Sequence, residues 1–196
     1  MPNWNENIIT IEGDDYEINR LLEKSVGTAS MDDGSDNEIP FLMENFFPCP
    51  KKEDSDKPFD GWYQWRLQNW GCKWDMDNVF CDRNKKEVEL SYQTPWGPNS
   101  EFWDKISEDF PKLNITLSYY EGGMMFGGRV EWEDGDRTVD NHYAIENGSN
   151  IDELKDFAID MKDLGFEWAY NDIHEYVITD LLEELEEEKK ENTDEG

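Results

Sequence analysis

Apolar and polar residues alternate in several short stretches of the chain, which predicts β-strands with one side in a core. The clearest case is residues 88–94 (VELSYQT), where every second residue is apolar or can be buried. A period of two residues is typical of a half-buried strand. Similar patterns predict further strands at residues 4–13, 78–82, 115–120, 126–133 and 139–145.

Other stretches repeat their apolar residues every three or four positions, which predicts helices. The first follows Asp14 or Asp15 and the second follows Asn99 or Ser100, side chains that commonly begin helices. The apolar stripes lie at residues 18–22, 102–110, 151–161 and 173–185. Residues 166–170 alternate and predict a short strand, whereas the small, acidic residues 28–38 predict a loop.

The order of these elements is β-α-β-β-α-β with added strands. This order predicts an α+β fold of the ferredoxin-like type, a mainly antiparallel sheet covered on one face by two helices. We expect a ferredoxin-like domain at residues 1–145, with a loop insertion near 26–60. Residues 146–196 are expected to form a C-terminal helical extension with an acidic tail.

The most unusual stretch is residues 62–76 (WYQWRLQNWGCKWDM), which holds four of the nine tryptophans. Gly71 permits a turn here, and we expect Lys73 and Asp75 at the solvent-exposed rim. Two interpretations stay open, a structural core feature and an aromatic-lined ligand cleft. The residues assigned to this elbow are Trp62, Trp65, Asn69, Trp70, Gly71, Lys73 and Trp74.

Charge narrows the choice of partner. The chain has 18 basic and 48 acidic residues, a formal net charge of −30. Direct binding to nucleic acid depends on cations that displace counterions from phosphates, so we expect none. A partner with a basic surface is favoured instead, with fast and salt-sensitive association.

The acidic residues are densest at the end of the chain, on the last predicted helix. They could act as a solubilising surface, or they could imitate the charge of a nucleic acid towards a basic protein. The predicted partner-binding residues are Asp180, Glu183, Glu184, Glu186, Glu187, Glu188 and Glu191.

Few residue patterns indicate chemistry. Cys49, Cys72 and Cys81 cannot all pair with one another, which favours a reducing compartment and cysteines that act as small buried hydrophobes. The histidines, His142 and His174, lack a second histidine at ligand spacing, so we expect no metal site. We also expect no cofactor, and no apolar run is long enough to predict a membrane span.

Several motifs occur in the same order as in a known family. They are residues 1–4 (MPNW), 46–50 (FFPCP), 62–65 (WYQW), 69–74 (NWGCKW), 92–96 (YQTPW) and 126–128 (FGG). Over residues 1–136 the chain resembles the YubB-like ferredoxin-like domain of bacteriophage and conjugative-plasmid proteins, although Asn5 stands where that family has a cysteine. The resemblance implies the fold, an origin in a mobile element and a bacterial cytoplasm, but no catalytic residues.

These observations predict a non-enzymatic phage protein that binds and inhibits a basic host protein, such as a DNA-binding or defence factor. Acidic contacts that imitate DNA would attract this partner, and exposed aromatic residues would anchor it. One alternative is a small-ligand-binding or catalytic domain with its cleft at the Trp70–Trp74 elbow. Another is a structural or homo-oligomeric role through the open face of the sheet.

Overall fold

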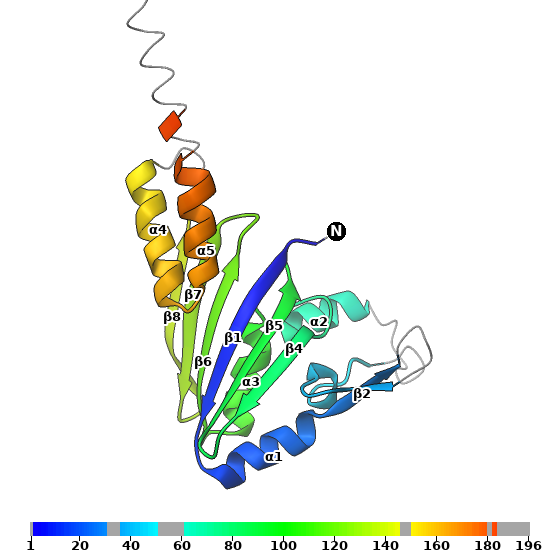
Figure 1. Cartoon of the computed structure of the whole chain (residues 1–196). Helices are drawn as coiled ribbons and strands as arrows, with labels where there is room; N and C mark the ends of the chain where they lie inside the picture. Colours follow the sequence, from blue (N-terminus) through cyan, green and yellow to red (C-terminus); the bar gives the residue numbers. More distant parts are fainter. Residues whose placement is uncertain (1, 31–35, 51–60, 146–149, 180–181, 184–196) are drawn as a thin grey trace, which may run out of the picture.

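The computed structural model describes residues 2–30, 36–50, 61–145, 150–179 and 182–183. Its centre is an antiparallel sheet in the order β4-β5-β1-β6-β7-β8 (Figure 1). The strands predicted within residues 4–145 are therefore present, and β1 lies between β5 and β6, antiparallel to both. The bounds are β1 (Trp4–Glu12), β4 (Asp77–Arg83), β5 (Glu87–Pro95), β6 (Asn114–Glu121), β7 (Phe126–Glu133) and β8 (Asp136–Ala144).

Helices α1 and α3 connect strands that are not neighbours and pack on one face of the sheet. The series β1-α1-β4-β5-α3-β6 is the ferredoxin-like arrangement, with β7 and β8 added beside β6. The predicted α+β fold is thus confirmed. The helical segments are α1 (Asp15–Ser25), η1 (Met43–Asn45), α2 (Trp62–Trp70), α3 (Ser100–Asp109), α4 (Ile151–Asp163), α5 (Glu167–Asp172) and the π-helical η3 (Ile173–Ile178).

Large aromatic side chains make up nine of the 23 buried residues in the core between the sheet and its helices. Trp70, Trp103 and Trp132 are completely or almost completely buried. Each indole N–H donates a hydrogen bond, to the Phe47 carbonyl, the Tyr92 hydroxyl and the Asp104 carboxylate respectively. These rings can be buried because their only polar atom has a partner.

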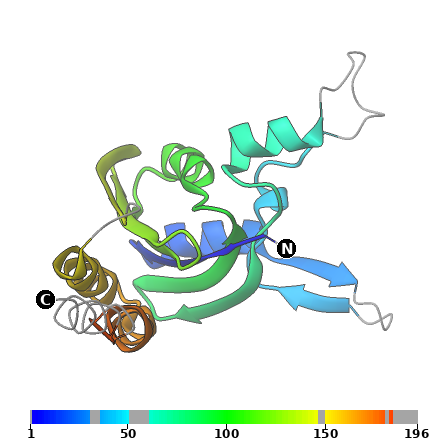
Figure 2. The same cartoon turned by 90° about the horizontal axis from the view of Figure 1, so that it is seen from above.

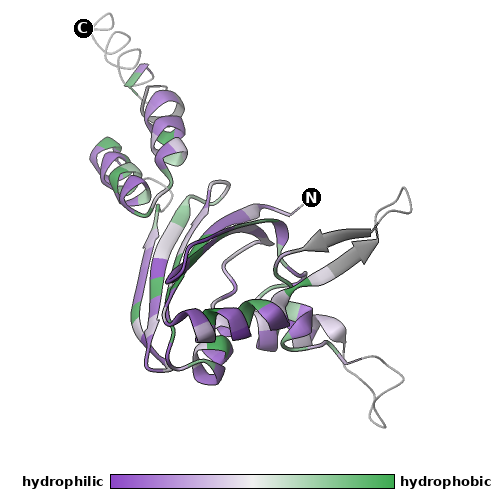
Figure 3. Ribbon diagram, turned by 60° about the horizontal axis from the view of Figure 1, so that its bottom comes forward, coloured by the Kyte–Doolittle hydropathy of each residue, from purple (hydrophilic) through white to green (hydrophobic). Residues whose placement is uncertain are grey.

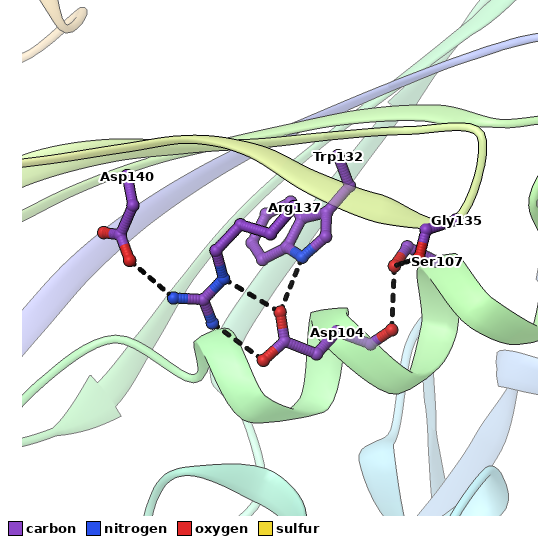
Figure 4. A network of polar contacts seen from close by, with 6 residues as sticks. All are labelled: Asp104, Ser107, Trp132, Gly135, Arg137 and Asp140. Atoms are coloured by element: carbon purple, nitrogen blue, oxygen red, sulfur yellow. Dashed lines mark hydrogen bonds and ion pairs between the residues drawn. The ribbon is translucent and has the colours of Figure 1, made fainter.

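A polar clamp ties α3 to the added strands (Figure 4). The Arg137 guanidinium donates to both Asp104 oxygens at 3.0 and 2.7 Å, and to Asp140 at 2.7 Å. The Trp132 indole donates to the same Asp104 carboxylate at 2.7 Å. A two-pronged contact of this kind fixes geometry as well as charge, so it sets where β7 and β8 lie against α3.

A second apolar cluster lies on the opposite face of the sheet. There α4 and α5 pack on Tyr120 of β6 through Phe157, Met161 and Phe166. Figure 2 shows these two helices on the other side of the curved sheet from α3, and Figure 3 shows their mixed hydrophobic and hydrophilic residues. The second face, expected to be open, is therefore partly covered.

Two local predictions are wrong. Residues 28–38 were expected to be a loop, but strands β2 (Gly27–Ser30) and β3 (Asp36–Ile39) pair there as an antiparallel hairpin. Residues 166–170 were expected to be a strand, but they enter α5, since Phe166, Ala169 and Ile173 are buried at helical spacing while Trp168 is exposed. Packing on Tyr120 selects the helical period over the alternating one.

The caps of the first two helices also differ from expectation. Asp14 and Asn99 occupy the positions before α1 and α3, but neither side chain makes a capping hydrogen bond. Asn99 is instead buried and accepts a hydrogen bond from the Tyr92 hydroxyl at 2.7 Å. This hydroxyl in turn accepts the Trp103 indole N–H at 2.8 Å, so one oxygen joins β5 to α3.

Replacing Tyr92 with phenylalanine should therefore destabilise the fold. Y92F leaves a buried indole N–H and a buried amide oxygen without partners, which costs about 1–3 kcal/mol for each group. Y119F is the matched control, because the hydrogen-bond partner of the Tyr119 hydroxyl is the exposed His142 ring, at 2.9 Å. Urea denaturation should show a much larger loss for Y92F, and equal losses would contradict this role.

Candidate functional site

The elbow, residues 62–76, begins as helix α2, and this helix ends at Gly71. Gly71 has a φ of 77°, a left-handed conformation, and its N–H donates to the Leu67 carbonyl at 3.1 Å. A Cβ atom added here would collide with the Glu101 carboxylate. Glycine is thus needed both for the backbone conformation and for the approach of α3.

Part of the elbow has a structural role. Trp70 is buried and contacts Trp65 edge to face, with ring centroids 6.0 Å apart. Asn69 donates to the Trp65 carbonyl at 2.7 Å and accepts a hydrogen bond from Lys105 of α3. These three side chains hold α2 against α3 and Phe47.

Asp75 does not lie at the exposed rim, as was expected. Its carboxylate accepts hydrogen bonds from the backbone N–H groups of Met43, Glu44 and Met76 at 2.8–2.9 Å. Burial raises the pKa of the Asp75 carboxyl above its ordinary value, and these hydrogen bonds offset only part of that rise. The side chain therefore anchors η1 to the elbow.

Three other elbow residues, Trp62, Lys73 and Trp74, lie near the surface beside Trp4 and Trp96. We call these five residues the tryptophan cluster. The Trp74 ring centroid is 6.2 Å from that of Trp4 and 5.8 Å from that of Trp96. Trp62 and Trp96 expose 45% and 49% of their surface. Half-exposed indoles gathered at one place are typical of binding hot spots.

Trp96 holds an unusual backbone conformation, with a φ of 67°. A left-handed conformation is costly for a bulky residue and requires support from its surroundings. Here the Trp96 N–H donates to the Asn3 carbonyl at 2.9 Å, and the Thr94 hydroxyl donates to the Gly97 carbonyl at 2.7 Å. The buried Asn7 amide in turn donates to the Thr94 hydroxyl at 2.8 Å.

A second feature is the uncovered part of the sheet face opposite α1 and α3, which we call the acidic face. Alternation along each strand places the apolar residues in the core and the acidic residues outside. Within the described residues, Arg129 is the one basic side chain that β1 and β4–β7 place on this face. The acidic residues are Glu6, Glu12, Asp77, Asp82, Glu87, Glu89, Glu131 and Glu133.

Like charges stand directly opposite each other on the acidic face. Glu12 of β1 pairs with Glu87 of β5, and Glu89 of β5 pairs with Asp82 of β4. Directly opposed like charges destabilise a sheet. A depression of about 110 Å³ at this edge is lined by Asp82, Glu87 and Glu89 together with Arg83 and Asn84. Phe80, 72% exposed, lies on the same face.

The predicted acidic tail lies almost wholly outside the described residues. Glu183 is described and exposed. The other tail residues assigned to partner binding fall outside the described ranges, so their role stays a prediction: Asp180, Glu184, Glu186, Glu187, Glu188 and Glu191.

The remaining candidates from the sequence are the cysteines and a metal site. Cys72 is 1% exposed, and burial raises the pKa of its thiol. Cys81 is exposed, so the expectation that all three cysteines are buried is wrong. Within the described part of the chain, no three His, Cys, Asp or Glu side chains are grouped to hold a metal ion.

Sequence reasoning missed two parts of the site. Trp4 and Trp96 were assigned to a strand, a strand break and two family motifs, but to no site, although a tryptophan between Pro95 and Gly97 could have indicated an exposed turn. The acidic face was visible as the polar half of the alternation in β5. Its like-charge pairs depend on strand register, which alternation alone does not give.

Comparison with known proteins supports the fold. Residues 70–161 match the family model for the ferredoxin-like domain in Api92-like protein, from the end of α2 into α4. A ferredoxin-like domain of this kind is thus found in the chain. The narrower resemblance to YubB-like proteins stays a prediction.

Among solved structures, the crystal structure of a protein api92 from Yersinia pseudotuberculosis is similar to this chain. It has 9% identity and a TM-score of 0.48, over 76% of this chain and 100% of that one. This likeness is too weak to carry an argument. No curated protein matches the chain, and none of the described helices combines the length and hydropathy needed to cross a membrane.

Replacing Gly71 with alanine should destabilise the elbow. G71A forces a side chain into the left-handed region, at a cost of about 1–2 kcal/mol. G97A is the matched control, because its added Cβ would meet no atom within 4 Å and its φ is not positive. Thermal unfolding should show a lower midpoint for G71A, and no difference between the two variants would contradict the assignment.

Proposed function

We propose that the protein is a non-enzymatic binding protein that docks a basic protein on the acidic face. The observation that carries the proposal is the register that sets Glu12 against Glu87 and Asp82 against Glu89. In the part of the chain that the structure describes, none of these four carboxylates forms an ion pair, although the Asn84 amide donates to Glu87 at 3.2 Å. Lysine or arginine side chains of a partner would remove this like-charge repulsion on binding. The free energy released in this way would add to the affinity.

The partner is proposed to be a protein rather than a nucleic acid. Phosphates would be repelled by the acidic face and by the net charge of −30. The sheet holds the carboxylates in rows and so presents a fixed array of negative charge to a basic protein. The phosphates of DNA form a comparable array, and in this sense the face could imitate DNA. Phe80 supplies an exposed apolar contact among these charges.

The motifs that resemble YubB-like proteins extend the proposal to origin and location. A protein of a phage or plasmid would meet its partner in a bacterial cytoplasm. The partner would then be a host protein that handles nucleic acid or defends against such elements, and binding would inhibit it. The acidic tail from Asp180 to Glu191 would add long-range attraction. A ligand or catalytic site at the elbow and homo-oligomerisation remain alternative predictions.

Neutralising one member of each like-charge pair should raise the stability of the fold and weaken binding of the partner. In the double variant E12Q/E89Q, we expect slightly greater stability at low salt, by about 0.2–1 kcal/mol per pair. Capture of a basic protein from bacterial lysate should fall about tenfold, since contacts to the partner's cations are lost. Urea denaturation and quantitative mass spectrometry measure the two effects.

The control is E23Q/E108Q, which changes the net charge equally on exposed positions of α1 and α3. It should leave capture almost unchanged. If both double variants reduce capture equally, the effect is one of net charge and not of the acidic face. Capture that survives high salt unchanged would refute the electrostatic proposal.

The tail is tested separately by reversing charge at Glu183, Glu184 and Glu187. Charges that act by steering change the association rate and its salt dependence more than the dissociation rate. Surface plasmon resonance with the captured partner should show slower association and nearly constant dissociation. An unchanged association rate would mean that the tail contributes nothing to partner capture.

A further inference from the structure

The Lys73 ammonium group lies among three indole rings of the tryptophan cluster. Its Nζ atom is 4.6 Å from the ring centroid of Trp74, 5.5 Å from Trp96 and 5.9 Å from Trp62. All three distances are within the range of cation–π attraction, for which tryptophan is the best aromatic partner. Three rings around one cation form an aromatic cage.

The walls of the cage are held by separate parts of the fold. Trp62 begins α2 and has the Arg66 guanidinium over its ring at 5.3 Å. Trp74 is backed by Trp4 of β1, and Trp96 is fixed by its backbone hydrogen bond to Asn3. A cage assembled before binding loses little freedom when a ligand enters.

Lys73 itself is held weakly. Among the described residues, no carboxylate lies within ion-pair distance of its ammonium group. The ammonium is compact, strongly hydrated and carried on a flexible four-carbon stem. It can therefore leave the cage at small cost when another cation takes its place.

We propose that Trp62, Trp74 and Trp96 form a binding site for an arginine side chain, and that Lys73 fills this site in the free protein. A guanidinium is planar and less hydrated than an ammonium, so it stacks better on indole faces. The site adjoins one end of the acidic face, because Trp4 and Glu6 are two residues apart on the same side of β1. The inference rests on the proposed function, since it names how the basic partner is anchored.

The test uses two short peptides, acetyl-Gly-Arg-Gly-amide and its lysine counterpart, followed by the NMR signals of the indole N–H groups. The arginine peptide should shift the signals of Trp62, Trp74 and Trp96 and bind more tightly than the lysine peptide. K73Q removes the resident cation and should tighten arginine binding about two- to fivefold. K73R fills the cage with a guanidinium and should weaken it.

The matched control is K24Q, which removes a lysine that lies over a different aromatic ring. Lys24 lies over the Phe46 ring at 4.9 Å and not in the cage, so K24Q should leave peptide affinity unchanged. Equal affinities for K73Q and wild type, or signal shifts confined to other tryptophans, would overturn the inference. Because E12Q/E89Q should not alter peptide binding at the cage, failure of the cage and failure of the acidic face give different results.

Discussion

The pairing of β1 with β5 and β6 is the interaction on which the rest of the structure depends. Each antiparallel ladder fixes which residues face each other and which side of the sheet they occupy. On one side, Ile9 and Ile11 join the aromatic core. On the other, Glu12 stands against Glu87. The same hydrogen bonds that build the core therefore assemble the acidic face.

Tryptophans serve two purposes in this chain, and the difference lies in their surroundings. Trp70, Trp103 and Trp132 are buried with their indole N–H groups bonded to oxygen atoms. Trp62 and Trp96 are half exposed beside Lys73. The buried rings stabilise the elbow and α3, and this rigid base holds the exposed rings in place.

The tryptophan cluster lies beside the Glu6 end of the acidic face, whereas Glu12 lies at the other end of β1. Trp4 links them, since it contacts Trp74 and shares its side of β1 with Glu6. Carboxylates attract and orient a basic partner, whereas aromatic rings supply short-range affinity that salt screens less. A basic protein with a protruding arginine would match both halves.

The sequence by itself determined the strands of the six-stranded sheet, most helices and the excess of acid, because backbone geometry imposes its period on neighbouring residues. It could not determine the period of residues 166–170, where contact with Tyr120 selects α5. Nor could it bring Trp4, Trp74 and Trp96 together or set Glu12 against Glu87. Those arrangements depend on strand register and on packing between distant segments, which only the tertiary structure decides.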